Sequence, residues 1–161
     1  MRARDRAAGF SLIELMIVLG IVALLLRVAL PAYSGIRRDS YASQAAGDFN
    51  TVRAAAVAQY EATGSYPASG ASGQPPAGMA PYLPRDFSFT RPAYQLEWDN
   101  FAVNDTTGGS LVTGQVLAVT VTAADSLTGL VVLRTLGANC THWSVGNAHT
   151  FVVMSTLEAP H

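Results

Sequence analysis

The chain has 161 residues, of which 50% are hydrophobic and 13% charged, and its formal net charge is −1. This length allows one modest domain in addition to an apolar segment. All ten basic residues are Arg and none is Lys, which excludes a P-loop, because that motif requires a Lys on the phosphates. The mild acidity argues against nucleic acid as a partner, since such binding requires a clustered basic surface.

A basic segment, residues 1–9, precedes a long apolar run. From Phe10 to Leu30 the run has 21 residues, and a helix of that length reaches about 30 Å, close to the thickness of a bilayer core. Three Arg and one Asp in the segment 1–9 place the N-terminus in the cytoplasm by the positive-inside rule. We therefore interpret residues 1–9 as a targeting leader and exclude them from the fold.

One carboxylate, Glu14, lies inside the apolar run, with no Lys or Arg three or four residues away. A carboxylate at membrane depth costs at least a few kcal/mol unless a cation pairs with it. Cleavage of the peptide bond after Gly9 would create that cation, because the new amino group of Phe10 would lie one turn from Glu14.

The leader ending in Gly9 and the following residues 10–18, Phe-Ser-Leu-Ile-Glu-Leu-Met-Ile-Val, resemble the prepilin class of type IV pilins and type II secretion pseudopilins. The resemblance implies that a membrane peptidase cuts after Gly9 and methylates the amine of Phe10. It also implies that Glu14 helps to set the stagger between subunits. Pro31, followed by Ala-Tyr, matches a position where the stems of this family lose helical structure in the filament.

Two simpler interpretations of the N-terminus are less consistent with these residues. A secretory signal would also combine Arg with an apolar core, but no Ala-x-Ala site follows Leu26 and Glu14 is unfavourable in such a core. A plain single-span anchor explains the length of the run. It explains neither Glu14 nor the junction of Gly9 and Phe10.

Beyond the run, Pro31 removes a backbone donor and predicts a kink or a loosened helix over residues 27–30. Residues 36–61 then predict an amphipathic helix that ends before Gly64. Its apolar stripe has helical spacing and consists of Tyr41, Ala45, Phe49, Val52, Ala56 and Tyr60, with Asp48 among the polar residues mainly off the stripe.

Residues 65–92 contain six Pro, which exclude a continuous helix or an interior strand there. We expect a long surface loop with one short helical turn at residues 79–83. Residues 94–103, 115–122, 130–135 and 150–155 are rich in Val, Thr, Leu and aromatic residues and predict four strands. Turn residues at 107–109 and 125–129 suit antiparallel hairpins.

The predicted fold is therefore α+β. A long N-terminal helix, formed by a transmembrane stem (residues 10–35) and the amphipathic half, packs on a C-terminal antiparallel sheet of about four strands within residues 94–155. Residues 36–161 form the head outside the cytoplasm.

Few side chains suggest chemistry. Cys140, His142 and His149 do not have a recognised zinc spacing, and a loop with incidental polar residues is the better interpretation. Cys140 is the only Cys, so it cannot form the intrachain disulfide of many type IV pilins, and we expect it to be a small buried apolar residue.

Resemblance to major pseudopilins suggests Ca²⁺ ligands, but turns and a hairpin end explain the same residues better: Asp99, Asn100, Asn104 and Asp105.

We assign no catalytic residue, cofactor or metal, and expect the protein not to be an enzyme. The first hypothesis is a structural subunit of a type IV pilus, processed at Gly9 and Phe10 and assembled through Phe10, Glu14 and Pro31. The alternative is a type II secretion pseudopilin, and a third possibility is a membrane-anchored binding module.

The resemblance also implies partners and locations. The partners are other copies in a helical homopolymer, a prepilin peptidase and methyltransferase, an assembly platform and a separate ATPase motor. The subunit would wait in the bacterial inner membrane as a single-pass protein and then enter an extracellular pilus.

Overall fold

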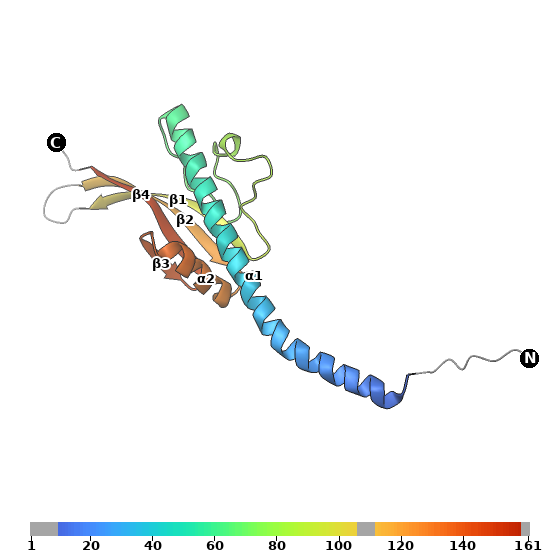
Figure 1. Ribbon diagram of the computed structural model, residues 1–161. Coiled ribbons are helices and arrows are strands. Elements are labelled where there is room, and N and C mark those ends of the chain that lie inside the picture. The colour runs from blue at the N-terminus through green and yellow to red at the C-terminus, as the bar shows by residue number, and fades with distance from the viewer. Residues whose placement is uncertain (1–9, 106–111, 159–161) are drawn as a thin grey trace, which may run out of the picture. The chain divides into compact units, whose positions relative to one another are not determined.

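The computed structural model describes residues 10–105 and 112–158. The elements follow in the order α1 (Leu12–Thr63), a 3₁₀ turn η1 (Ala80–Tyr82), β1 (Tyr94–Asp105), β2 (Val112–Ala123), α2 (Ser126–Gly137), β3 (His142–Val145) and β4 (Ala148–Glu158). The strands form one antiparallel sheet in the order β1-β2-β4-β3. This arrangement confirms the predicted α+β class (Figure 1).

The chain divides into two compact units, Met1–Arg37 and Arg38–His161, which are described separately. In the first unit the described residues form the N-terminal part of α1, and this helix continues without interruption through Pro31. The loosening predicted over residues 27–30 is therefore absent from the single chain. Pro31 still removes the N–H that would bond the carbonyl of Arg27, so this turn lacks one helical hydrogen bond.

In the second unit the remaining part of α1 packs on one face of the sheet. Its stripe is buried as predicted at Ala45, Phe49, Val52 and Ala56, because residues at this spacing share one face of a helix. Tyr60 departs from the prediction, since it is 44% exposed and stacks on Tyr66 at a centroid distance of 4.4 Å. The same core contains residues from the sheet and from α2, including Leu96, Trp98, Leu117, Val119, Val121, Val132, Leu136 and Phe151.

The segment 65–92 is a loop, as its Pro content predicts, and η1 lies within the predicted helical turn. Helix α1 ends at Thr63, and Gly64 follows with a φ of +76°, a conformation that Gly adopts without strain. The loop also borders the edge of β1. The N–H groups of Gly70 and Gly73 donate to the carbonyls of Trp98 and Leu96 at 2.9 and 2.8 Å, so this part of the edge is covered.

Two predictions in the C-terminal half are wrong. Residues 130–135 are not a strand but part of α2, and residues 125–129 are not a hairpin turn but the start of that helix. Asp125 is its N-cap and accepts hydrogen bonds from the N–H groups of Leu127 and Thr128 at 3.1 and 3.0 Å. The sheet instead contains β3, a strand that we did not predict. The predicted turn at 107–109 lies outside the described residues.

Candidate functional site

Ser11 and Glu14 form a reciprocal cap at the start of α1. The N–H of Ser11 donates to Oε2 of Glu14, and the N–H of Ile13 donates to Oγ of Ser11, both at 3.3 Å. These contacts form a variant of the capping box in which the Ser11 hydroxyl accepts from the second helical N–H, and they satisfy donors that the first turn leaves without helical partners. Sequence reasoning missed this role for Glu14, although Ser-x-x-Glu at the start of an apolar run is a signal for it.

The predicted processing residues, Gly9 and Phe10, come directly before this cap in the sequence. Phe10 directly precedes Ser11 and is 80% exposed, whereas Gly9 lies outside the described residues. The start of α1 therefore places an exposed Phe10 close in sequence to a carboxylate.

The apolar segment that follows is not covered by protein. A stretch of 18 residues in α1 is long and apolar enough to cross a membrane, and none of it is buried. Its large apolar side chains are exposed from Leu12 to Leu30. A helix that is apolar on all sides requires lipid or other helices around it.

Pro31, the third predicted assembly residue, has a local polar partner. Oγ of Ser34 donates to the carbonyl of Pro31 at 2.8 Å, and the Arg37 guanidinium lies 5.9 Å from the ring centroid of Tyr33. Both contacts are local to α1 on the C-terminal side of Pro31.

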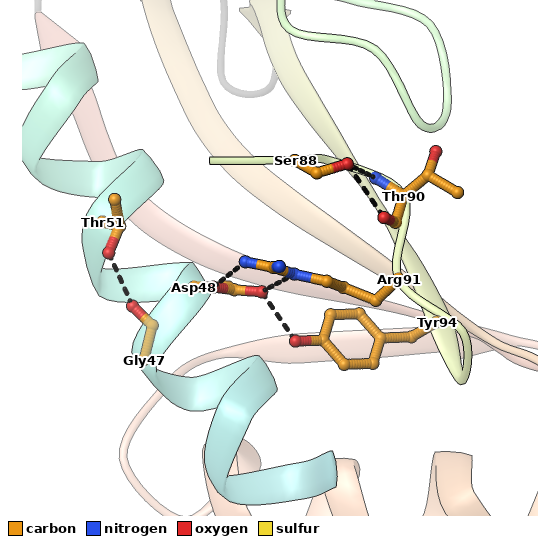
Figure 2. Close-up of polar contacts among 7 residues, drawn as sticks. All are labelled: Gly47, Asp48, Thr51, Ser88, Thr90, Arg91 and Tyr94. Carbon is orange, nitrogen blue, oxygen red and sulfur yellow. Dashed lines mark hydrogen bonds and ion pairs between the residues drawn. The ribbon is translucent and has the colours of Figure 1, made fainter. Parts of the chain in front are cut away.

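Asp48 is the charged centre of the second unit (Figure 2). Nε of Arg91 lies 2.9 Å from its Oδ2 and Nη2 lies 3.0 Å from its Oδ1, while the hydroxyl of Tyr94 donates to Oδ2 at 2.7 Å. The hydrogen bond to Asp48 raises the pKa of Arg91. Burial, followed by the bond to Asp48, raises the pKa of Tyr94.

Our prediction that Asp48 lies off the buried stripe is therefore wrong. Its carboxylate joins α1 to β1 and to the segment that precedes it, and both oxygens of the carboxylate are used. Such a saturated cluster stabilises the arrangement of elements rather than offering a reactive group.

Cys140, His142 and His149 lie near one another, but the Nδ1 atom of each His ring contacts an oxygen of the protein. Nδ1 of His142 lies 3.1 Å from the carbonyl oxygen of Cys140, and Nδ1 of His149 lies 2.7 Å from Oγ of Ser144. Burial, followed by the charge of His142, lowers the pKa of His149. Cys140 is only half-buried but packs against the core, so its apolar role is confirmed in part. Among the described residues, no three His, Cys, Asp or Glu side chains form a metal-binding group.

Asp99 and Asn100 lie within β1, inside the strand predicted over residues 94–103, so the turn that we preferred for these two residues is wrong. Neighbouring strand residues point to opposite faces. Oδ2 of Asp99 accepts from the hydroxyl of Thr120 at 2.7 Å, while Nδ2 of Asn100 donates to the carbonyl of Pro67 at 2.9 Å. These two side chains do not converge on one ion. Asn104 and Asp105 are also in β1, at its end.

Comparison with known protein families identifies the prokaryotic N-terminal methylation motif at residues 4–26. No curated protein and no solved structure matches the chain. The motif covers residues 4–9 of the predicted leader, the junction of Gly9 and Phe10, the cap formed by Ser11 and Glu14, and most of the unburied apolar run. The chain therefore carries the prepilin signature of type IV pilins and pseudopilins, on a long apolar N-terminal helix of the kind that anchors such proteins in the inner membrane.

Proposed function

We propose that this protein is the structural subunit of a type IV pilus. Prepilin peptidase cleaves the leader after Gly9, the new amine of Phe10 is methylated, and the subunit polymerises through its apolar helix. In this proposal residues 1–9 are the leader, residues 10–35 the stem and residues 36–161 the head. The stem holds the subunit in the inner membrane, with a cytoplasmic N-terminus, until it enters an extracellular filament.

The observation that carries the proposal is the position of Glu14. It is a carboxylate in the first turn of an unburied apolar helix, next to a junction that lies within the matched motif. The cost of a carboxylate in lipid is reduced when it bonds to the helix N-terminus, but a formal cation is still absent. Cleavage after Gly9 provides that cation on Phe10.

Assembly then transfers the stem from lipid into a bundle of other stems, so its apolar surface stays away from water throughout. Glu14 pairs with a Phe10 amine, in the same chain or in a neighbouring one, and the pair sets the axial register. A contact between two different surfaces of identical subunits does not close on itself and produces a filament. Pro31 marks the turn of the stem that already lacks one hydrogen bond, where the helix loosens most easily on packing.

Three further partners follow from this proposal. The peptidase and methyltransferase act on Gly9 and Phe10, and an assembly platform takes up the subunit. Since the chain contains no Lys and thus no P-loop, a separate ATPase drives assembly.

The proposal is tested by the mass of the N-terminal peptide in filaments sheared from the cell surface. We expect a chain that begins at a methylated Phe10. A chain that begins at Met1, or processed protein that is found only in membranes, would contradict the pilus assignment. The second result would favour the pseudopilin alternative.

A further inference from the structure

The sheet has a second face, turned away from α1 and α2. Leu96 and Trp98 on β1 are buried in the core, so the alternating residues Glu97, Asp99 and Phe101 point to the opposite side. The register of the sheet extends this face across the other strands. We call it the outer sheet face, and its members include Gln95, Glu97, Asp99, Phe101, Ala118, Thr120, Thr150, Val152 and Trp143.

Two aromatic rings meet on the outer sheet face. The rings of Phe101 on β1 and Trp143 on β3 lie 6.4 Å apart between centroids, at 51°, although β2 and β4 separate their strands. Phe101 is 42% exposed and Trp143 43%, so each keeps a large accessible ring surface. Exposed aromatic side chains that gather in one place are typical of binding surfaces.

Two Thr hydroxyl groups on the outer sheet face form a chain of hydrogen bonds that ends at Asp99. Thr150 pairs with Trp143 across β4 and β3, and its hydroxyl lies 2.8 Å from that of Thr120. Because the hydroxyl of Thr120 donates to Asp99, Thr150 must donate to Thr120. Both Thr side chains are buried, so this chain of hydrogen bonds orders the carboxylate of Asp99.

The charge on the outer sheet face is uncompensated. Among the described side chains of this face, Glu97 and Asp99 are the ionised groups and no Arg accompanies them. Glu97 makes no hydrogen bond or ion pair with any described residue. Burial, followed by the charge of Asp99, raises the pKa of Glu97.

We propose that the outer sheet face binds an arginine-bearing polypeptide segment of a partner protein. The two carboxylates offer charge-assisted acceptors, and the rings of Phe101 and Trp143 offer π surfaces on which a guanidinium can stack. Arg meets both requirements with one planar group, whereas Lys is a more strongly hydrated point charge. Carboxylates two residues apart on one strand face are about 7 Å apart, a spacing that suits successive Arg side chains of an extended segment.

The test uses the full chain in non-ionic detergent at low ionic strength, where charge contacts are least screened. Its probe is a fluorescently labelled, end-blocked peptide of alternating Arg and Gly. Matched peptides carry Lys or Glu in place of Arg. We expect saturable binding of the Arg peptide by fluorescence anisotropy, weaker binding of the Lys peptide and none of the Glu peptide. With the unlabelled peptide, Trp143 should become protected from acrylamide quenching, while the buried Trp98 contributes an unchanged background.

One variant tests the carboxylates of the outer sheet face and a second variant tests its aromatic rings. Glu97→Gln and Trp143→Leu should each weaken binding about two- to fivefold, the range of one exposed charge or cation–π contact. Asp86→Asn, which removes an exposed carboxylate in the loop 65–92, should leave binding unchanged. Far-UV circular dichroism confirms that each variant is folded.

Several results would overturn the proposal. The proposal fails if the Arg peptide does not bind, if the Lys peptide binds equally well, or if Glu97→Gln and Trp143→Leu both leave the affinity for the Arg peptide unchanged. Protection of Trp143 by a neutral oligosaccharide alone would assign the face to a sugar. Protection that grows with protein concentration in the absence of peptide would assign it to a second copy. Because none of these measurements requires filaments, their outcome is independent of the pilus assignment.

Discussion

Asp48 on α1 and Arg91, three residues before β1, form a two-pronged ion pair across 43 residues of chain, with both nitrogen–oxygen distances at or below 3.0 Å (Figure 2). The side chains are only 11% and 24% exposed, respectively. Tyr94 donates to the same carboxylate. Removal of Asp48 would therefore leave one cation and one buried hydroxyl without their acceptor.

We expect Asp48→Ala to lower the free energy of unfolding by about 2–3 kcal/mol, because donors lose their partner in a poorly hydrated site. The measurement is urea unfolding of the full chain in detergent, followed by near-UV circular dichroism. Asp39→Ala is the matched control. Its pair with Arg134 has a distance of 3.6 Å and side chains that are 64% and 78% exposed, so the loss should be at most about 0.5 kcal/mol. Equal losses in the two variants would refute a structural role for the Asp48 cluster.

Gly129 on α2 provides a second test of how the head is packed. A Cβ added there would lie 2.6 Å from Nε2 of His149, and His149 is buried. Gly129→Ala should therefore destabilise the head by about 1–3 kcal/mol through overpacking. Gly47→Ala is the contrasting change, since nothing lies within 4 Å of its added Cβ, and it should stabilise the helix by about 0.5–1 kcal/mol. The same unfolding measurement applies, and a neutral Gly129→Ala would show that α2 moves easily on the sheet.

Asp125 decides where α2 begins, since its carboxylate accepts two backbone N–H groups and the hydroxyl of Thr128. We expect Asp125→Ala to cost about 1 kcal/mol, the usual effect of losing an N-cap. Asp125→Asn should retain most of the stability, because its amide oxygen can accept the same backbone bonds. A loss as large in Asp125→Asn as in Asp125→Ala would contradict a capping role.

These residues also show what the sequence could and could not predict. The stripe of Phe49, Val52 and Ala56 was predictable, because local spacing alone defines a buried helix face. The partnership of Asp48 and Arg91 was not, since nothing local connects residues so distant in the chain. In α2, β-branched residues favoured a strand, but the N-cap at Asp125 and burial at Thr128, Val132 and Leu136 favour a helix.

The N-terminal site, too, could be predicted only in part from the sequence. The charge and position of Glu14 were readable from the run that surrounds it. Its bond to the N–H of Ser11 was predictable from the Ser-x-x-Glu pattern but was overlooked, because we considered only cations as its partners.

His149 predicts a pH dependence for the head. Burial lowers its pKa below the ordinary value of 6.5, so below about pH 6.5 the unfolded chain binds a proton that the folded chain does not. The contribution of His149 to stability is thus present above this pH and is lost as the pH falls towards its folded pKa. Thermal unfolding between pH 7 and pH 5 should show a decline that is smaller in His149→Gln. A steeper decline in that variant would contradict the assignment. The lowered pKa of Asp125 acts at lower pH, below its ordinary value of 3.8, so the two effects are separable.

Glu14 has two roles that substitutions can separate, because Gln can replace Glu in a capping box but carries no charge. If pairing with the Phe10 amine sets the register of the filament, Glu14→Gln and Glu14→Ala should both reduce the yield of sheared filaments severalfold while cleavage after Gly9 stays largely intact. Ser11→Ala, which removes the acceptor for the N–H of Ile13 but leaves the charge, should assemble nearly normally. The measurements are filament yield and the mass of the N-terminal peptide in the membrane fraction. Normal assembly of Glu14→Gln together with failure of Glu14→Ala would show that the cap, rather than the charge, is what assembly requires.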